Sequence, residues 1–220
     1  LASILRLLAP TALALLAVSC SSTPDPPEEV FDRKNQASRY AEFGNDHFAA
    51  AEYDMALRFF ELALRENTAV DNQPGIAGNH NSIGRVYLAA GRADAAESNF
   101  LRALEIATRH DAPEPLVQAQ SNLAELYLTD DRTEAAEAAL EEAMRVIASE
   151  DLDADPIVQH NLAVVRMRQG SLSEAEELLR GAAELNEKAR AWGELASNHY
   201  MLAALQRRRG DLPAAIAEAR

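Results

Sequence analysis

Aromatic residues are scarce in this chain of 220 residues: Phe, Trp and Tyr together make up 5% of it, although 48% of its residues are hydrophobic. Glycine is also rare, with nine residues, and alanine and leucine dominate the apolar positions. Small and straight-chain apolar residues favour closely packed helices over sheets. The composition therefore predicts an all-α fold.

Positive charge is the second shortage. The chain has 21 Lys and Arg against 35 Asp and Glu, which gives a formal net charge of −14. Such an acidic protein is not expected to bind nucleic acid or anionic lipid through its body. The one basic run, Arg207-Arg208-Arg209, is expected to be the solvated end of a helix, where cations suit the helix dipole.

Sequence motifs of catalysis and metal binding are missing as well. The sequence has no HExxH motif, no pair of cysteines, no Gly-rich phosphate loop and no Ser or Cys nucleophile motif. His80, His160 and His199 are candidates for meeting across one surface, but no carboxylate or cysteine spacing accompanies them, so surface or partly packed histidines are expected. We therefore predict no enzymatic activity, no catalytic residue, no metal and no cofactor.

Cys20 is the only cysteine, and the residues before it read as a secretory leader. Arg6 is followed by an apolar run over residues 7–19, which is too short for a permanent membrane-spanning helix and ends in small residues. Residues 1–19 are therefore predicted to be a signal peptide. Because the sequence begins with Leu1, we expect that part of the charged leader is missing or that the start codon is unusual.

The surroundings of Cys20 resemble a bacterial lipoprotein signal, with Leu16-Ala17-Val18-Ser19 before it and a polar run after it. The resemblance implies that Cys20 is lipidated and, because a serine follows it, that the protein is anchored in the outer membrane facing the periplasm. Ala17 departs from the pattern, since leucine is commonest there. The alternative is an ordinary leader with an incidental cysteine, although a lone thiol is a liability in an oxidising compartment.

After the cysteine, residues 20–31 are predicted to be an extended, mobile tether. They contain Pro24, Pro26 and Pro27 among serines and acidic residues, and such a segment cannot bury apolar surface.

The rest of the chain repeats one pattern at a nearly constant step. Turns are predicted at residues 51, 91, 131, 170 and 210, so the intervals are 40, 40, 39 and 40 residues. After the turn at Gly91, the small residues Ala96 and Ala103 lie seven apart with Phe100 between them. The corresponding large residues in the other complete repeats are Phe60, Leu140 and Leu179. A fixed period in this range indicates a stacked-repeat protein.

The segment before each turn carries a matching small residue. Seven residues upstream of the five turns lie Gly44, Gly84, Ala124, Ala163 and Ala203. Two antiparallel helices approach closely only where neither carries bulk, so each turn is predicted to join an A helix to a B helix across a seam of small residues. Each hairpin leaves an apolar face that only its neighbours can cover.

These residues make the chain similar to tetratricopeptide repeat (TPR) proteins, whose motif pairs a large apolar residue and Gly in helix A with Gly, Ala, Phe or Tyr, and Ala across the turn and helix B. The resemblance departs from the motif in period, which is 34 residues in the basic repeat, and in the missing terminal proline. It implies an α-solenoid of stacked antiparallel helix pairs over residues 32–220. The predicted repeats are 37–76, 77–116, 117–155, 156–195 and an incomplete 196–220.

The links between repeats contain polar residues and proline. Those beginning at Asp71, Asp111 and Asp151 are predicted to end one helix and start the next, with Asp as the cap and Pro in the first turn. The fourth link lacks proline, and its Trp192 is expected in the core or at a cap. Residues 212–220 are expected either to form a short closing helix or to mark a truncated repeat, and truncation is favoured.

In TPR folds the A helices line a concave groove that usually binds peptides. Carried over by position, the peptide-binding groove includes Asn81, Arg85, Gln118, Asn122, Glu125, His160 and Asn161, together with Ser38, Asn45, Gly78, Ser121 and Met167. Asn122 and Asn161 hold the same repeat position, which resembles an asparagine ladder, because an amide can both donate to and accept from a peptide backbone. The alternative is that these asparagines stabilise helix ends or contact water.

The resemblance implies a membrane-anchored scaffold that binds a protein or peptide partner in its groove and assists assembly of a cell-envelope complex, by analogy with outer-membrane TPR lipoproteins that pilot type IV pilus secretins. Two alternative functions stay open. One is an adaptor that recruits peptidoglycan or other envelope enzymes. The other is the N-terminal part of a longer enzyme truncated after Arg220. No nucleic acid and no small-molecule cofactor is expected among its partners.

Overall fold

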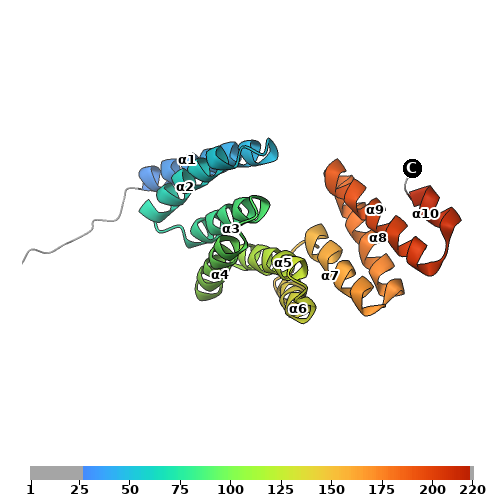
Figure 1. The fold of residues 1–220 in the computed structure, drawn as a ribbon. Coiled ribbons are helices and arrows are strands. Elements are labelled where there is room, and N and C mark those ends of the chain that lie inside the picture. Colours follow the sequence, from blue (N-terminus) through green and yellow to red (C-terminus); the bar gives the residue numbers. More distant parts are fainter. Residues whose placement is uncertain (1–26, 219–220) are drawn as a thin grey trace, which may run out of the picture.

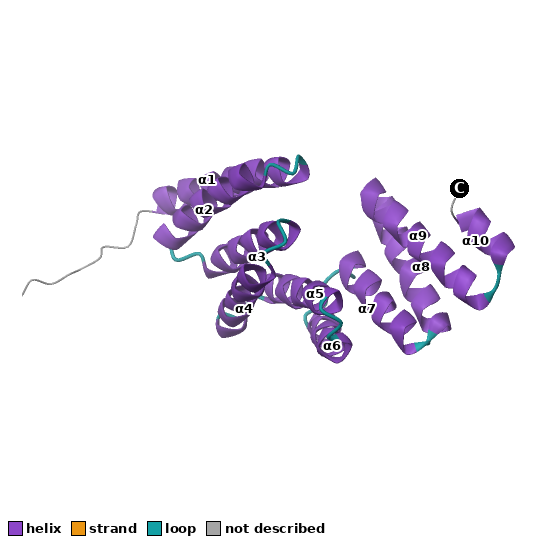
Figure 2. Ribbon diagram, in the orientation of Figure 1, coloured by secondary structure: helices purple, strands orange, loops and turns teal. Residues whose placement is uncertain are grey.

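The computed structural model describes residues 27–218, and every regular element in that range is a helix (Figures 1 and 2). The helices are α1 (Pro27–Ala49), α2 (Tyr53–Ala69), α3 (Gln73–Ala89), α4 (Ala93–Arg109), α5 (Pro113–Thr129), α6 (Thr133–Ser149), α7 (Pro156–Gln169), α8 (Leu172–Ala189), α9 (Trp192–Arg209) and α10 (Leu212–Glu218). Odd-numbered helices are the A helices of the repeats and even-numbered helices the B helices. The predicted signal peptide and Cys20 lie outside the described residues.

The five predicted turns are confirmed. Ala51, Gly91, Asp131, Gly170 and Gly210 each have a positive φ and each ends an A helix. The links between repeats end in the same way, with positive φ at Asp71, Asp111, Asp151 and Arg190. In all nine turns the next residue donates its backbone N–H to a carbonyl five residues earlier, as Arg92 does to Tyr87 at 2.8 Å. This left-handed turn satisfies carbonyls that the helix end leaves free.

The link aspartates were predicted to cap the following helix, but Asp71, Asp111 and Asp151 form the left-handed turn that ends the preceding one. Asp71, Asp111 and Asp151 adopt the left-handed conformation that Asp tolerates better than most residues. Asp155 does cap a helix: its Oδ1 accepts from the backbone N–H groups of Ile157 and Val158 at 2.7 and 3.2 Å.

The predicted seams of small residues are confirmed by the packing within each pair. An added Cβ on Gly84 would lie 2.4 Å from Phe100, and one on Gly44 would lie 2.6 Å from Phe60. In the third and fourth repeats an alanine faces a leucine instead, and all four of these residues are completely buried. These are the pairs Ala124 with Leu140 and Ala163 with Leu179. The seam thus keeps a similar volume, as Gly plus Phe or as Ala plus Leu.

Each core cluster joins neighbouring repeats. Ala56 and Phe60 of the first repeat pack with Ile83 and Val86 of the second, and a larger cluster runs from Val117 in α5 to Val165 in α7. No pair buries its apolar face alone, which is why the helix pairs stack into one continuous solenoid (Figure 1).

Three sequence predictions are wrong in detail. Residues 27–31 were predicted to belong to the tether, but they are the first five residues of α1. The predicted repeat boundaries at 77, 117 and 196 lie about one turn inside α3, α5 and α9. Trp192 is neither buried nor a cap: it is the first residue of α9 and is 62% exposed.

None of the described helices combines the length and the apolar character that a bilayer crossing requires.

Arg166 ties the third repeat to the fourth. This largely buried guanidinium on α7 bonds to Glu137 of α6 and, at 2.8 Å, to Glu174 of α8. The hydrogen bond from Arg166 is the main cause of a lowered pKa at Glu137, and burial of the carboxylate opposes the shift. Tyr87 and Tyr127 hold the same repeat position and instead stack under Arg92 and Arg132, whose guanidinium carbons lie 4.6 and 4.0 Å from the ring centroids.

Candidate peptide-binding groove

The A helices form the inner side of the solenoid. Helix α3 contacts α5, and α5 contacts α7, whereas within the described range the B helices make at most marginal contact with each other. A stack whose A helices lie closer together than its B helices is concave on the A side. The groove predicted to lie along the A helices is therefore a real concavity, and it contains two hollows.

The first, which we call the N-terminal hollow, has a volume of about 300 Å³ and lies between α3 and α5. Its lining comes from α1, α3, α5 and the start of α7, and consists of Asn45, Asn81, Ser82, Arg85, Gln118, Ser121, Asn122, Asp155 and Ile157. Nearly all these side chains are polar, so the hollow suits a ligand with many hydrogen-bonding groups.

Two buried polar side chains in the N-terminal hollow are only partly satisfied. Asn81 is 2% exposed and donates its Nδ2 to the backbone carbonyl of Pro115 at 3.0 Å, while its Oδ1 has no partner among the described residues. Ser121 is 4% exposed, and its Oγ likewise has no partner within residues 27–218. Each unpaired buried group costs free energy, about 1–3 kcal/mol, that a hydrogen-bonding ligand would recover.

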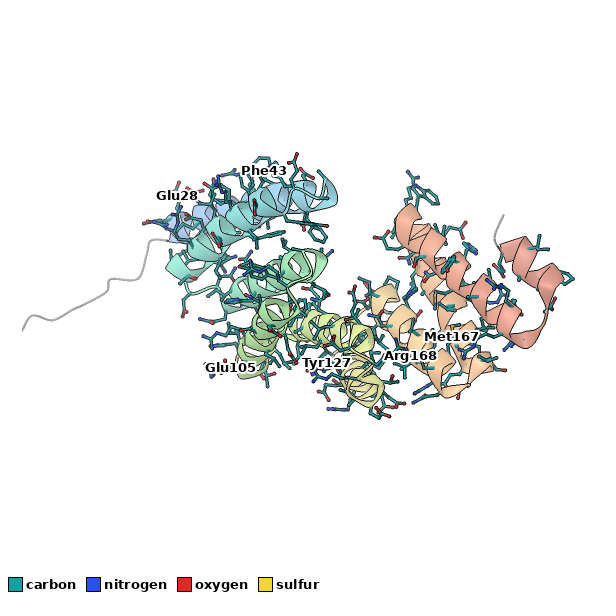
Figure 3. The ribbon with its side chains drawn as sticks, viewed as in Figure 1. Glu28, Phe43, Glu105, Tyr127, Met167 and Arg168 are labelled. Atoms are coloured by element: carbon teal, nitrogen blue, oxygen red, sulfur yellow. The ribbon has the colours of Figure 1, made fainter. Side chains whose placement is uncertain are left out.

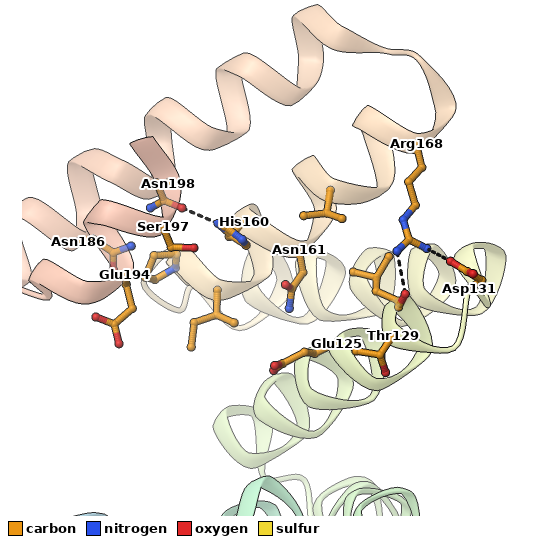
Figure 4. Close-up of a pocket in the computed structure, with 14 residues that line it drawn as sticks. Glu125, Thr129, Asp131, His160, Asn161, Arg168, Asn186, Glu194, Ser197 and Asn198 are labelled. Carbon is orange, nitrogen blue, oxygen red and sulfur yellow. Dashed lines mark hydrogen bonds and ion pairs between the residues drawn. The ribbon is translucent and has the colours of Figure 1, made fainter. Parts of the chain in front are cut away.

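The second, which we call the C-terminal hollow, is larger, at about 750 Å³, and is formed by α5, α7, α8 and α9 (Figure 4). Its polar lining includes Glu125, His160, Asn161, Asn186, Glu194 and Asn198. Ile157, which is 51% exposed, lines both hollows and lies at their junction.

Asn161 and Asn198 line the C-terminal hollow and each has a buried, unpaired donor. Their side chains are 7% and 1% exposed, and the Nδ2 of each has no partner among residues 27–218. The Oδ1 of Asn198 lies 2.5 Å from Nδ1 of His160, so this side chain is held by its oxygen while its nitrogen stays free. Figure 4 shows the Asn161 amide pointing from α7 into the space above α5, where Glu125 lies.

The seven residues predicted for the groove divide between the two hollows. Asn81, Arg85, Gln118 and Asn122 line the N-terminal one, and Glu125, His160 and Asn161 line the C-terminal one. The two ladder asparagines, Asn122 and Asn161, therefore face different hollows. Of the wider set, Met167 is wrong, because its side chain is 6% exposed and packs in the core. Binding of a peptide by these residues stays a prediction.

Sequence reasoning missed Asn186 and Asn198. A signal was present, because Asn67 and Asn79 lie at the corresponding places of the first two repeats, also twelve residues apart. Asparagines at otherwise apolar positions in two repeats indicate that a buried amide has a role there.

The cations near the groove are already engaged. Arg168 donates to the backbone carbonyl of Leu128 at 2.8 Å and pairs with Asp131 at 3.2 Å (Figure 3 shows its place on α7). The guanidinium of Arg85 lies 5.0 Å from the ring centroid of Phe48.

The three inner histidines do not meet. Each has its own partner: His80 lies 3.1 Å from Asn99, His160 lies against Asn198, and His199 lies 3.0 Å from Glu218. Over residues 27–218, no group of three or more His, Cys, Asp or Glu side chains is placed to hold a metal ion.

Comparison with known proteins identifies the family of this chain. A family model described as "Tetratricopeptide repeat" matches residues 35–109 and 75–149, and a second model with the same description matches residues 199–220. The chain belongs to the tetratricopeptide repeat family. TPR domains serve as protein-binding scaffolds, so the groove described above is where a partner would be sought. No curated protein matched the chain in a comparison of sequences.

Several solved structures share this TPR fold. BtubC from P. vanneervenii has a TM-score of 0.62 at 16% identity, with 87% of each chain covered. TTC0263, a TPR protein of Thermus thermophilus, has a TM-score of 0.59 at 22% identity, covering 83% of this chain and 87% of that one. The Rap conjugation gene regulator of plasmid pLS20, solved with the Phr* peptide, has a TM-score of 0.67 at 19% identity, covering 94% of this chain. The present chain spans 57% of that regulator's length.

Proposed function

We propose that this chain is a membrane-anchored TPR scaffold that binds a protein partner through an extended segment lying in the groove, and that it thereby helps a cell-envelope complex to assemble. The observation that carries the proposal is a set of four buried polar side chains whose donor or acceptor is unpaired within residues 27–218, namely Asn81, Ser121, Asn161 and Asn198. They face two neighbouring hollows of one concave surface.

An extended peptide suits these hollows because its backbone offers a donor and an acceptor at every residue. Side chains of the partner would find only one large exposed apolar contact at the junction, Ile157. The solved complex of the Rap regulator with the Phr* peptide shows that a protein of this fold holds a peptide. The acidic composition favours a protein partner over nucleic acid.

The groove is tested by photo-crosslinking in intact cells. A photoreactive amino acid at Gln118, exposed in the groove, should yield an adduct with one partner, whereas the same residue at Thr108, exposed on α4, should not. Replacing both Asn122 and Asn161 by Ala should reduce the Gln118 adduct, while Ser98→Ala on the outer helix α4 should not. Equal adducts from Gln118 and Thr108 would contradict binding in the groove.

The anchor is tested separately through Cys20. Lipidation requires the thiol, so Cys20→Ser should move the protein from the membrane fraction to the soluble fraction after cell breakage. A serine variant that stays in the membrane fraction would remove the anchor from the proposal and leave the groove untouched.

A further inference from the structure

The C-terminal hollow has an uncompensated negative charge. Glu125 of α5 and Glu194 of α9 are both exposed and line it from opposite sides (Figure 4). Within residues 27–218, neither carboxylate forms an ion pair with a cation of the chain. The nearby Arg168 is committed to Asp131 and to the carbonyl of Leu128, so it does not neutralise them.

The deeper wall of the same hollow offers donors. The Nδ2 atoms of Asn161 and Asn198 are buried and have no partner in the part of the chain that the structure describes, and His160 fixes the orientation of Asn198. The donors in the wall and the carboxylates at the rim would bind different groups of a ligand. The donors need oxygen acceptors such as main-chain carbonyls, and the carboxylates need a cation.

The N-terminal hollow has a different charge pattern. Its only cation is Arg85, and its only carboxylate, Asp155, already accepts two backbone N–H groups of α7. An uncompensated pair of carboxylates therefore distinguishes the C-terminal hollow. A partner segment that follows the groove would meet amides and the cation Arg85 in one hollow, and an uncompensated pair of carboxylates in the other.

Building on the proposed function, we infer that the partner segment carries a lysine or arginine that enters the C-terminal hollow. Asn161 and Asn198 donate to its main-chain carbonyl oxygens, and Glu125 and Glu194 bind the cationic side chain between them. A volume of about 750 Å³ lies within the range of ligand pockets, about 300–1,000 Å³, and leaves room for a long side chain together with its backbone. The apolar stem of that side chain can lie against Ile157 and Val164.

Peptide selection on the 220-residue chain tests this inference. Random nine-residue peptides are displayed and selected on the immobilised protein, and enriched peptides are synthesised with a fluorescent label for anisotropy measurements. We expect a Lys or Arg at one fixed position. Replacing that lysine by acetyl-lysine, or that arginine by citrulline, should weaken binding at least tenfold, because the stem is kept and the charge is lost.

The carboxylates are tested with a matched pair of charge variants. The double variant Glu125→Gln and Glu194→Gln should weaken the lysine peptide about tenfold and leave the acetyl-lysine peptide unchanged. The control Glu61→Gln and Glu184→Gln changes the net charge equally on exposed positions of the B helices α2 and α8, and should leave both peptides unchanged. All four substitutions are at exposed residues, so the fold is retained, and circular dichroism checks this.

Two failures are distinguishable. Enriched peptides without a basic residue, or a lysine peptide that binds the Glu125→Gln and Glu194→Gln protein as well as the original, would overturn the charge selectivity while peptide binding stands. If no peptide is enriched, or if the selected peptides bind an Asn161→Ala and Asn198→Ala variant undiminished, the groove itself is not the binding site and the proposed function falls with it.

Discussion

Asparagines at equivalent repeat positions have different roles in the N-terminal and C-terminal halves of the solenoid. At the junction of α2 and α3, Asn67 donates to Asn79 at 2.8 Å and accepts from Asn72 at 2.7 Å, which makes a closed, buried network. At the junction of α8 and α9, the counterparts Asn186 and Asn198 line the C-terminal hollow, and Asn198 turns to His160.

The difference comes from two neighbouring residues. Counting from the turn residues Asp71 and Arg190, the position of Asn72 is taken by Ala191, and that of Gly75 by Glu194. A Cβ on Gly75 would lie 2.4 Å from Asn72 and 2.6 Å from Asn67, so only glycine lets the N-terminal network close. The alanine and the glutamate leave the C-terminal pair open, which turns a structural network into the wall of a candidate binding site.

The seams differ between the halves as well, and breaking one gives the largest expected effect. Gly84→Ala forces a Cβ into Phe100 and should lower the free energy of unfolding by about 1–3 kcal/mol. Phe100→Leu in the same chain should recover part of this loss, because it recreates the Ala–Leu pair of the later repeats, with a coupling of about 0.5–3 kcal/mol. Urea denaturation of the two single variants and the double variant measures the coupling.

Additive losses in that cycle would show that the seam volume is not shared between the two residues. As a control, Ala163→Gly in the Ala–Leu seam should cost about 1 kcal/mol through helix propensity and lost packing.

The second largest loss of stability is expected at the asparagine junction between α2 and α3. Asn67→Ala removes the hub of the closed network and strands polar atoms of Asn72 and Asn79, so it should cost about 1–3 kcal/mol. Asn186→Ala at the open junction should cost less than about 1 kcal/mol, because within residues 27–218 no other side chain depends on its amide for a hydrogen bond, and Asn198 is bonded to His160 instead. Thermal unfolding compares the two variants, and equal losses would contradict the distinction between closed and open junctions.

Acid sensitivity should distinguish the equivalent repeat positions of Arg166 and Tyr87. Since the pKa of Glu137 is lowered in the folded state, its contribution is fully present above the unfolded pKa of about 4.3 and is lost as the pH falls through the folded pKa. Arg166→Met should therefore cost about 1 kcal/mol at pH 7 and less below about pH 4. Tyr87→Leu, which removes a stacking contact with Arg92, should cost the same at both pH values.

Urea denaturation of both variants at pH 7 and pH 3.5 measures this difference. A pH-independent loss for Arg166→Met would mean that packing of the arginine stem, and not its ion pairs, holds the third and fourth repeats together.

The turns give the smallest effect. Ala51 has a left-handed conformation with φ of 58°. The equivalent turn positions of the C-terminal half are occupied by Gly170 and Gly210. Ala51→Gly should raise the free energy of unfolding by about 0.5 kcal/mol, and Gly170→Ala should lower it by about 1 kcal/mol. Differential scanning calorimetry measures both, and a loss of stability in Ala51→Gly would show that the entropy of glycine outweighs the relieved strain.

The sequence by itself determined the helix pairs, their turns and their seams. A left-handed turn depends on a few adjacent residues, and the small residue at Gly84 is matched to Phe100 within one hairpin, so both leave a periodic trace along the chain. The general position of the groove followed from the same periodicity, because helical phase assigns each residue to a face.

Only the tertiary structure decided which polar residues are buried and which hollow they face. Asn122 and Asn161 share a repeat position but line different hollows, and Asn67 and Asn186 share another but differ in partners. These outcomes depend on how three or four helices from different repeats meet. The exposure of Trp192 belongs to the same class, because it depends on which helices lie beside the start of α9 and not on local pattern.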